Sequence, residues 1–572
     1  MSSSTLSAHA VATRSSAVPR HGRSAPPAQP GQGMSHREIL EALSGLLLGM
    51  FVAILSSTVV SNALPTILSQ LHGGESAYTW VVTATLLATT VTTPIWGKLS
   101  DLFSKKLLVQ FALVIFVASS AVAGLSQTPG MLIACRVFQG IGAGGLTALA
   151  QVVMAAMIAP RERGRYSGYL GATFALATVG GPLIGGVLVD TSWLGWRWCF
   201  YVGVPFAAAA IIVLQKTLHL PTIKRDAKID YWGATLLTAG VSLLLIWVSL
   251  AGHQFAWTSW QTSLMVGGSI VLLLVTLLVE SRVAEPIIPI RLFGNRTVSV
   301  ATVASLFVGV ALFGATVFLS LYFQISRGVS PTKSGLMTLP MILGLVVSST
   351  IVGQLITRTG RWKRFLVIGG ILLTAGFALM TTLRADSDYL HVAVFMAMIG
   401  LGVGMMMQNL VLAVQNTVDP HDLGAGSSLV VFFRSLGGAV GVSALGAVLS
   451  NRVAHFVEVG LAGIGVHGGT GQGSAVPNLA ILPAPIRAVV ENAYGHATGN
   501  IFLAAAPFAL LSLIAVLFIK EVPLRKINAT QGAAAVANAA SVPDVEEGVT
   551  VAEPETKPEP VPVVVGRHRR VG

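Results

Sequence analysis

The amino-acid sequence predicts an all-α integral membrane protein whose chain crosses the bilayer fourteen times. Hydrophobic residues make up 53% of its 572 residues and charged residues only 10%, whereas a soluble domain carries about 25% charged residues. Apolar segments of roughly 18 to 25 residues recur from about residue 43 onward, and each is long enough to span a bilayer as a helix. Most of the chain must therefore lie in lipid.

The predicted spans follow one another along the chain and are separated mostly by short loops. They cover residues 43–63, 79–97, 107–125, 130–155, 166–189, 199–216, 233–251, 263–280, 299–321, 335–356, 364–383, 391–415, 424–449 and 499–520. Residues 1–37 and 523–572 are expected to be disordered cytoplasmic tails, and the first 34 residues contain no apolar run long enough for a signal peptide. A Gly-rich outer loop is expected over 451–498, with a short helix over 485–494.

The distribution of charge predicts the orientation of the chain. The formal net charge is +13, and most of the 36 lysine and arginine residues fall in the tails and in alternate short loops, such as Lys105 and Lys106 after the second span. Cytoplasmic loops carry such an excess in membrane proteins. Both termini are therefore expected in the cytoplasm, with the protein in the cell (inner or plasma) membrane. The basic balance then needs no nucleic-acid partner.

The sequence offers no residue pattern typical of an enzyme, a metal site or a cofactor site. The two cysteines, Cys135 and Cys199, lie in or beside apolar segments, so they predict neither a disulfide framework nor a metal-binding spacing. Gly140, Gly142 and Gly145 fit the dinucleotide-binding pattern, but that site needs a strand and a soluble βαβ unit around it. These glycines lie inside a predicted span, where close packing of helices is the simpler explanation.

The chain repeats itself weakly. A glycine at the end of a span is followed by a tight basic loop at residues 97–106 and again at 353–364, and the glycines at 140–145 are echoed at 400–404. Six spans, an insert of two spans and six further spans account for the count. Duplicated halves around a cavity at the midplane are the usual plan of secondary transporters. The expected units are an N-terminal six-helix bundle, a linker with the two-helix insert, and a C-terminal six-helix bundle, over residues 38–216, 217–297 and 298–522.

Arg136 is an energetically unfavourable residue inside the fourth predicted span. An arginine there costs roughly 2.5–3.5 kcal/mol on insertion scales, so it should face a partner or a water-filled cavity. Gln139 and Gly140 follow one turn later, and the glycines of this stretch let another helix or a substrate approach the backbone. We expect Arg136, Gln139 and Gly140 to line the cavity. The alternative is a purely structural arginine that stabilises the helix packing through hydrogen bonds to backbone carbonyls and water.

A loop motif with Gly97, Asp101, Lys105 and Lys106 follows the second span. A carboxylate in this position can cap the next helix and pair with the facing basic loop. Such pairs hold two helix bundles together on the inner side and break when an inner gate opens. The alternative is an ordinary solvated loop.

The fifth span contains Gly181, Pro182, Gly185 and Gly186. Proline frees a backbone carbonyl and glycines remove side chains, which predicts a bent helix packed closely against a neighbour. A simple kink without a special interface is the alternative.

Together these stretches resemble the major facilitator superfamily, specifically its fourteen-helix drug:proton antiporter branch. The resemblance covers roughly residues 38–525. It rests on the family patterns of the first span, the loop after the second, the fourth span and the fifth: residues 55–65 with Ser56 and Asn62; Gly97, Leu99 and Asp101; Arg136, Gln139, Gly140 and Gly142; and Gly181, Pro182, Gly185 and Gly186. It implies a secondary exporter of drugs or other amphiphilic small molecules, coupled to protons as an antiporter through alternating access, with no cofactor and as a monomer.

Two positions depart from the family pattern. Ser104 stands in place of a glycine, and Ser56 stands where an aspartate commonly binds the proton and pairs with the arginine of the fourth span. No other acidic residue lies deep in a predicted span, while Arg434 is a second cation in the membrane. The coupled proton would then bind Asp101, or a carboxylate at a helix end such as Asp422.

Two alternatives to a proton-coupled drug exporter therefore stay open. A cavity with cations and no acid suits anionic or neutral amphiphiles, or lipids, better than organic cations. A non-transporting membrane sensor or assembly partner is a different class, in which the outer loop and the tails would serve binding. The gate-type loop and the glycines of the fifth span argue against this second alternative.

Overall fold

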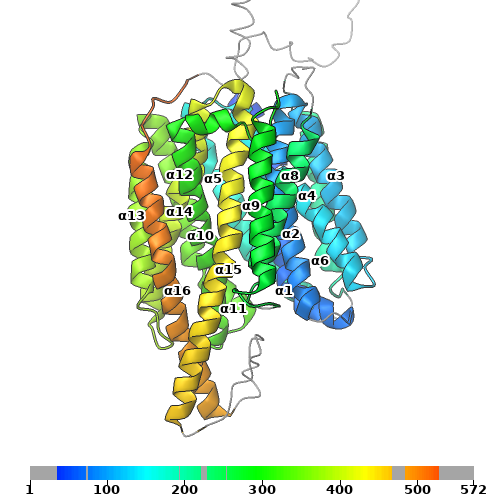
Figure 1. Ribbon diagram of the computed structural model, residues 1–572. Coiled ribbons are helices and arrows are strands. Elements are labelled where there is room, and N and C mark those ends of the chain that lie inside the picture. Colours follow the sequence, from blue (N-terminus) through cyan, green and yellow to red (C-terminus); the bar gives the residue numbers. More distant parts are fainter. Residues whose placement is uncertain are drawn as a thin grey trace, which may run out of the picture.

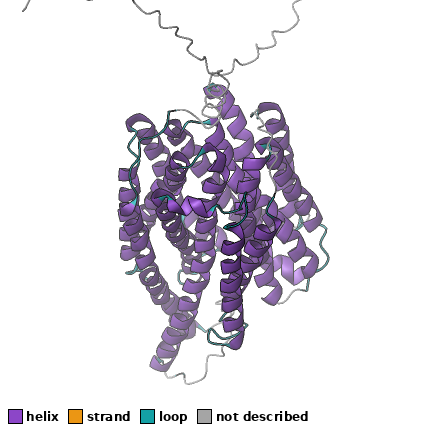
Figure 2. Cartoon of the chain, turned by 45° about the horizontal axis from the view of Figure 1, so that its top comes forward, coloured by secondary structure: helices purple, strands orange, loops and turns teal. Residues whose placement is uncertain are grey.

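The computed structural model describes residues 35–72, 75–191, 194–218, 220, 229–252, 254–464, 466 and 483–526. The regular structure of these residues is helical, apart from an isolated β-bridge between Ala251 and Phe255. The long helices stand side by side in a bundle (Figure 1, Figure 2), so that backbone polar groups are satisfied within each helix. The all-α prediction is confirmed. Of the expected tails (1–37 and 523–572), residues 1–34 and 527–572 lie outside the described residues, as does the Gly-rich segment at 467–482; α1 already begins at His36.

The helices follow the predicted spans closely. The first seven are α1 (His36–Gln70), α2 (Glu75–Leu102), α3 (Lys105–Ala123), α4 (Pro129–Met157), α5 (Pro160–Asp190), α6 (Trp198–Tyr201) and α7 (Gly203–Thr217). The insert consists of α8 (Tyr231–Leu250) and α9 (Trp260–Glu280). The remaining helices are η1 (Ile290–Gly294), α10 (Arg296–Ile325), α11 (Pro331–Met337), α12 (Leu339–Thr359), α13 (Lys363–Met380), α14 (Tyr389–Thr417), η2 (Pro420–Asp422), α15 (Leu423–Gly463) and α16 (Ala484–Phe518).

Thirteen segments of the described residues are long and apolar enough to cross a membrane. One of them joins the short α6 to α7. The 28-residue α2 stands among these segments in the bundle (Figure 1) and brings their number to the predicted fourteen. The chain is thus a multi-pass membrane protein.

The last two long helices extend beyond their predicted spans. α15 is 41 residues long and reaches Gly463, whereas its predicted span ends at residue 449, and α16 begins at Ala484 rather than near residue 499. The two extensions form a hairpin that projects past the other helices (Figure 1). Val457, Leu461 and Val490 are buried there. Much of the expected outer loop is therefore helical, because these apolar side chains give the two helices a shared core.

The helices pack into two sets, α1–α7 and α10–α16, which we call the first and the second set. α2 packs on α4 in the first set, and α12 packs on α14 in the second. The sets meet where α5 contacts α12 and where α2 contacts α15. We call the boundary between the sets the seam.

The glycine repeat marks equivalent contacts in the two sets. A Cβ atom on Gly140 of α4 would stand 2.6 Å from the carbonyl oxygen of Thr85 in α2, so only glycine permits this approach. Gly400 of α14 makes the corresponding close approach to Met341 of α12. The weak sequence repeat therefore reflects one packing arrangement used twice.

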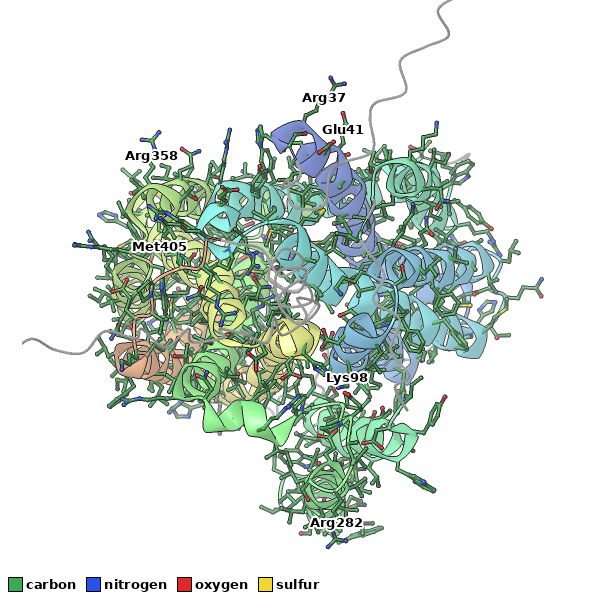
Figure 3. The ribbon with its side chains drawn as sticks, turned by 90° about the horizontal axis from the view of Figure 1, so that it is seen from above. Arg37, Glu41, Lys98, Arg282, Arg358 and Met405 are labelled. Atoms are coloured by element: carbon green, nitrogen blue, oxygen red, sulfur yellow. The ribbon has the colours of Figure 1, made fainter. Side chains whose placement is uncertain are left out.

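The insert lies outside both sets and beside the seam (Figure 3). α8 contacts both α2 and α15, while α9 packs on α8 and exposes Leu264, Ile270 and Leu274. We call the end of the bundle at which α1 begins and α16 ends the tail end, and the opposite end, with the α15–α16 hairpin, the hairpin end (Figure 1).

Candidate functional site

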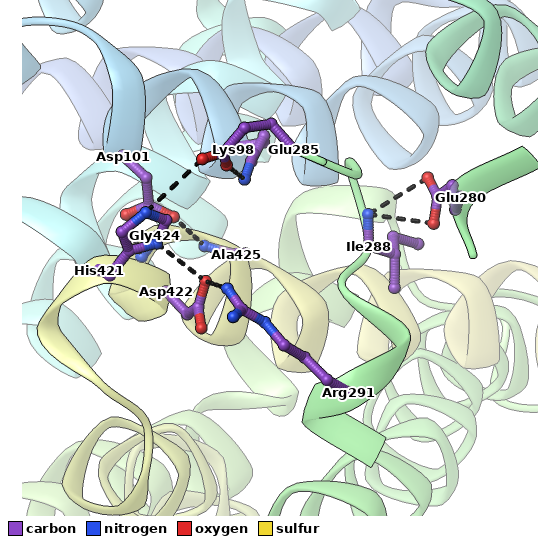
Figure 4. A network of polar contacts seen from close by, with 10 residues as sticks. All are labelled: Lys98, Asp101, Glu280, Glu285, Ile288, Arg291, His421, Asp422, Gly424 and Ala425. Atoms are coloured by element: carbon purple, nitrogen blue, oxygen red, sulfur yellow. Dashed lines mark hydrogen bonds and ion pairs between the residues drawn. The ribbon is translucent and has the colours of Figure 1, made fainter. Parts of the chain in front are cut away.

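Asp101 connects the two sets at the tail end. It lies in the last turn of α2, and its Oδ1 and Oδ2 atoms accept hydrogen bonds from the backbone N–H groups of Gly424 (2.8 Å) and Ala425 (2.9 Å) (Figure 4). These are N–H groups of the first turn of α15, which have no partner within their own helix. A carboxylate at a helix N-terminus also interacts favourably with the helix dipole. We call this contact the Asp101 latch.

Gly97 permits the latch because it lets α2 approach α15. A Cβ atom at this position would stand 2.8 Å from the carbonyl oxygen of Gly424 and would collide with the side chain of Ser428. The sequence placed Gly97 and Asp101 in one motif, and the structure brings both onto α15. The expectation that Asp101 caps the next helix is wrong, since α3 begins after Ser104 without a side-chain cap.

The two lysines of the motif make contacts within the first set. Lys105 Nζ donates to the carbonyl oxygen of Ser100 (2.9 Å), and Lys106 Nζ donates to the carbonyl oxygen of Gln215 in α7 (2.7 Å). These two hydrogen bonds hold the ends of α2 and α3 to their own set.

A second polar network crosses the seam near the tail end and is missing from the sequence predictions. The buried Arg163 of α5 donates to Gln415 Oε1 of α14 (2.8 Å) and to the carbonyl oxygens of Ile158 and Ala155 (2.8 and 2.6 Å). Deeper in the seam, Gln151 Nε2 of α4 donates to Gln408 Oε1 of α14 at 3.0 Å. In the sequence Arg163 stands in a basic stretch with Arg161 and Arg165, and nothing in its spacing indicates a buried partner on the other half of the chain.

The chain after α16 forms a further connection. Its residues 519–526, which we call the C-terminal strap, run over the tail end as an extended segment. Asn416 at the end of α14 donates to the carbonyl oxygen of Pro523 (3.1 Å) and accepts from the N–H of Arg525 (2.9 Å). The carbonyl oxygen of Arg525 accepts from the N–H of Arg161 in α5 at 3.2 Å. The strap thus connects the second set to the first.

Arg136 is buried in α4 with little to balance its charge. Its Nη1 donates to Gln139 Oε1 (3.1 Å), and Gln139 Nε2 donates to Ser120 Oγ of α3 (2.8 Å). Arg136 Nε has no hydrogen-bond partner among the described residues. The Ser56 hydroxyl is also buried and unpartnered, so it makes no hydrogen bond to Arg136. The side chain of Asn62 lies outside the described side chains.

Arg434 of α15 resembles Arg136 in being buried and unbalanced. Its Nη1 has no hydrogen-bond partner, and the ion pairs of the described residues involve neither arginine. Arg136 lies about 10 Å from the start of α4 at the hairpin end, and Arg434 lies about 17 Å from the start of α15 at the tail end, given the rise of about 1.5 Å per helical residue. The two cations therefore occupy different depths in the bundle.

An apolar cavity lies between the sets. It is small, with about 40 Å³ open to a water-sized sphere, and its wall includes Phe174 and Thr178 of α5, Leu312 and Thr316 of α10, and Met341 of α12. Among the described residues no charged side chain lines it, and the threonine hydroxyls supply its polar groups. Such a wall suits an apolar molecule with few hydrogen-bonding groups.

The glycines of the fifth span pack α5 on α1. A Cβ atom on Gly185 would stand 3.1 Å from the carbonyl oxygen of Val59, and one on Gly181 would collide with the side chain of Thr58. Gly186 instead faces the start of α11, where a Cβ atom added to it would stand 3.7 Å from Oγ1 of Thr332. The side chain of Pro182 lies outside the described side chains, so the predicted bend stays a prediction.

Comparison with known proteins identifies the family. The sequence model of the Major Facilitator Superfamily matches residues 46–442. The chain belongs to the major facilitator superfamily. It is accordingly a membrane transporter and not an enzyme.

Relatives within the superfamily share most of the chain. An uncharacterised MFS-type transporter of Mycobacterium tuberculosis is 38% identical over 490 residues, which is 85% of this chain and 70% of the relative. The multidrug transporter protein MdtP of Bacillus subtilis is 37% identical over 410 residues, covering 72% of this chain and 75% of the relative. The solved structure of the proton:xylose symporter XylE has the same superfamily fold, with a TM-score of 0.56 at 13% identity over 87% of this chain and 99% of that one.

Proposed function

We propose that this transporter exports drugs or other amphiphilic small molecules from the cell in exchange for protons, by alternating access. The observation that carries the proposal is the Asp101 latch, which closes the tail end of the seam over an apolar cavity between two similar sets of helices. The printed name of the Bacillus subtilis relative, a multidrug transporter, favours an exporter. The cavity wall, which is apolar apart from its threonine hydroxyls, favours cargo with a large apolar part.

The latch offers a simple way to couple a proton to opening. The ionised Asp101 carboxylate stabilises the first turn of α15 through its negative charge. A proton that enters from outside, through the hairpin end, and reaches Asp101 while the tail end is closed removes that charge and weakens both hydrogen bonds. The sets then separate at the tail end, the proton leaves to the cytoplasm, and cargo enters the cavity. Reclosure with ionised Asp101 directs the cargo to the other side.

The proposal includes the orientation and the units of the chain. The tail end faces the cytoplasm, because basic residues such as Lys105 at the start of α3 and Arg361 before α13 lie there. The N-terminal bundle (38–216), the insert with its linkers (217–297) and the C-terminal bundle (298–522) then form one working monomer. We propose that one copy suffices for transport, because both sets of helices of the same chain contribute to the cavity wall.

A second candidate changes the cargo and keeps the fold. Arg136 and Arg434 are buried cations without a carboxylate partner among the described residues. A positive interior favours anionic or neutral amphiphiles, or lipids, over organic cations. Efflux of ethidium-like cations alone, with no acidic or neutral compound exported, would count against this candidate.

The test of the main proposal uses everted membrane vesicles that contain the full-length protein. Vesicles are energised until their lumen is acidic, and candidate compounds are then added outside. Proton antiport predicts that a transported compound raises the lumenal pH, and that vesicles carrying Asp101→Asn show little change. Accumulation of a compound without any change in lumenal pH would contradict proton coupling while leaving export intact.

A further inference from the structure

The linker after the insert, residues 281–295, lies against the seam at the tail end. It connects α9 to α10, and it includes the short helix η1. Its Ile287 is 3% exposed and belongs to a buried cluster with Val91 of α2, Leu237 of α8 and Phe432 of α15. One linker side chain therefore packs against both sets and the insert together.

Glu285 of this linker lies between one basic residue from each set. Its Oε2 atom is 2.5 Å from Nζ of Lys98 in α2, and its Oε1 atom is 3.7 Å from Nε2 of His421 in η2 (Figure 4). The Lys98 side chain is only 3% exposed, while that of Glu285 is 25% exposed. An ammonium group that deep needs a counter-charge, because an unpaired buried charge is strongly unfavourable.

The linker is fixed to the second set and to the insert by other contacts. Arg291 Nη2 lies 2.9 Å from Oδ1 of Asp422, whose side chain is 5% exposed. Both carboxylate oxygens of Glu280 accept from the N–H of Ile288 at 3.2 Å. The chain then continues directly into α10 of the second set. When the sets separate, the linker should therefore move with the second set, and its contact with Lys98 should break.

Lys98 and Asp101 are three residues apart and share one face of α2. Asp101 reaches the first turn of α15, and Lys98 reaches the linker (Figure 4). We propose that the insert's linker is part of the gate, and that the Lys98–Glu285 pair is a second latch between the sets, which must open together with the Asp101 latch. The two-helix insert then has a role in transport, since it holds this carboxylate at the seam.

The proposal rests on alternating access as the mode of transport, but not on the cargo or on proton coupling. Its test therefore measures the gate itself. Two spin labels, at the exposed Phe103 between α2 and α3 and at the exposed Arg361 before α13, report the separation of the sets at the tail end. The labelled protein is the full chain in lipid nanodiscs, with Cys135 and Cys199 replaced by alanine, and pulsed electron resonance gives the distance distribution.

Glu285→Gln and Lys98→Gln should each raise the ratio of open to closed tail ends roughly tenfold, because each leaves the other partner without its ion pair. The double variant should raise it no further than the single variants, since the two residues act as one pair. Lys98→Arg, which keeps the charge, should stay close to the unmodified protein. Glu41→Gln removes an exposed pair within α1 and serves as the matched control, with no expected change.

Two results would overturn the proposal. The first is a Glu285→Gln distribution equal to that of the unmodified protein. The second is a double variant whose effect is the sum of the two single effects, which would mean that Lys98 and Glu285 act independently. If these variants shift the distances but no compound is ever exported, the second latch stands and the proposed function fails.

Discussion

At the scale of single residues, a few charges determine how the two sets hold together. Asp101 is balanced by backbone N–H groups of α15, and Lys98 by Glu285, whereas Arg136 has only a neutral amide within reach. The first two charges lie at the tail end, where they connect the sets. Arg136 lies closer to the hairpin end, where its charge has no acidic partner at Ser56.

Replacing Asp101 by asparagine should remove most of the transport activity. The amide keeps the size of the side chain but loses the negative charge that stabilises the first turn of α15, an interaction worth about 0.3–2 kcal/mol in helix N-terminal sites. Export from energised cells should fall about tenfold or more. Lys106→Gln, which alters a contact inside the first set, is the matched control. Unchanged export by Asp101→Asn would show that the latch is not required.

Arg136→Ala should abolish export, because it removes both the fixed charge and the donor that orients Gln139 toward Ser120 of α3. Arg136→Lys, which keeps a cation without the planar guanidinium, should retain part of the activity. Export per molecule in reconstituted vesicles is the appropriate measurement, since it separates transport from expression. Normal export by the alanine variant would mean that the arginine is only structural.

At the scale of helices, small residues decide which elements can touch. Gly97 lets α2 reach α15, and Gly140 and Gly400 let α4 and α14 reach their partners in equivalent ways. These contacts depend on backbone approach, for which any Cβ atom is too large. The C-terminal strap adds a different kind of contact, because its backbone is bonded by Asn416 and by the start of α5.

Gly97→Ala should impair the gate, since its methyl group would collide with Ser428 and force α2 away from α15. We expect export to fall at least fivefold, in line with the cost of about 1–3 kcal/mol for overpacking a well-packed site. Gly130→Ala is the control, because no atom lies within 4 Å of the added methyl group there. Equal export by the two variants would refute the packing argument.

Two C-terminal truncations distinguish the contribution of the strap from that of the residues after it. A chain that ends after Lys526 keeps the hydrogen bonds of Pro523 and Arg525, and it should export normally. A chain that ends after Val522 loses the contacts with Asn416 and Arg161. It should show a larger open fraction at the tail end in the spin-label experiment and weaker export. If both truncations behave like the full chain, the strap contributes nothing to closure.

At the scale of the whole molecule, the structure is closed at the tail end by contacts that differ in chemistry. Four contacts cross the seam or its edge: the Asp101 latch, the Arg163 network, the strap and the Lys98–Glu285 pair. The charged contacts can respond to a proton, while the amide and backbone contacts cannot. Opening the tail end must break them together, which makes the transition between states cooperative.

The charge of the cargo should decide how export responds to the membrane potential. In a one-for-one exchange, a neutral molecule leaving against an entering proton moves one net charge, whereas a cation moves none. Collapsing the potential with potassium and valinomycin should therefore lower the attainable concentration ratio of a neutral cargo about fiftyfold per 100 mV, from 2.3 kcal/mol per charge. If the concentration ratio of a neutral cargo does not change when the membrane potential is collapsed, the one-for-one stoichiometry is wrong.

The sequence by itself determined the membrane class, the number of spans and the paired halves. The length of an apolar segment must match the thickness of the bilayer, and the repeated glycines are visible along the chain without knowledge of which helices meet. The sequence also placed Gly97 and Asp101 in one motif. It could not identify the partner of Asp101, which lies more than 300 residues away in the first turn of α15. Tertiary structure likewise decided three other features: the contact of Arg163 with Gln415, the extent of the α15–α16 hairpin and the contact of Glu285 with Lys98. Each depends on which helices meet across the seam, and that follows from packing in three dimensions.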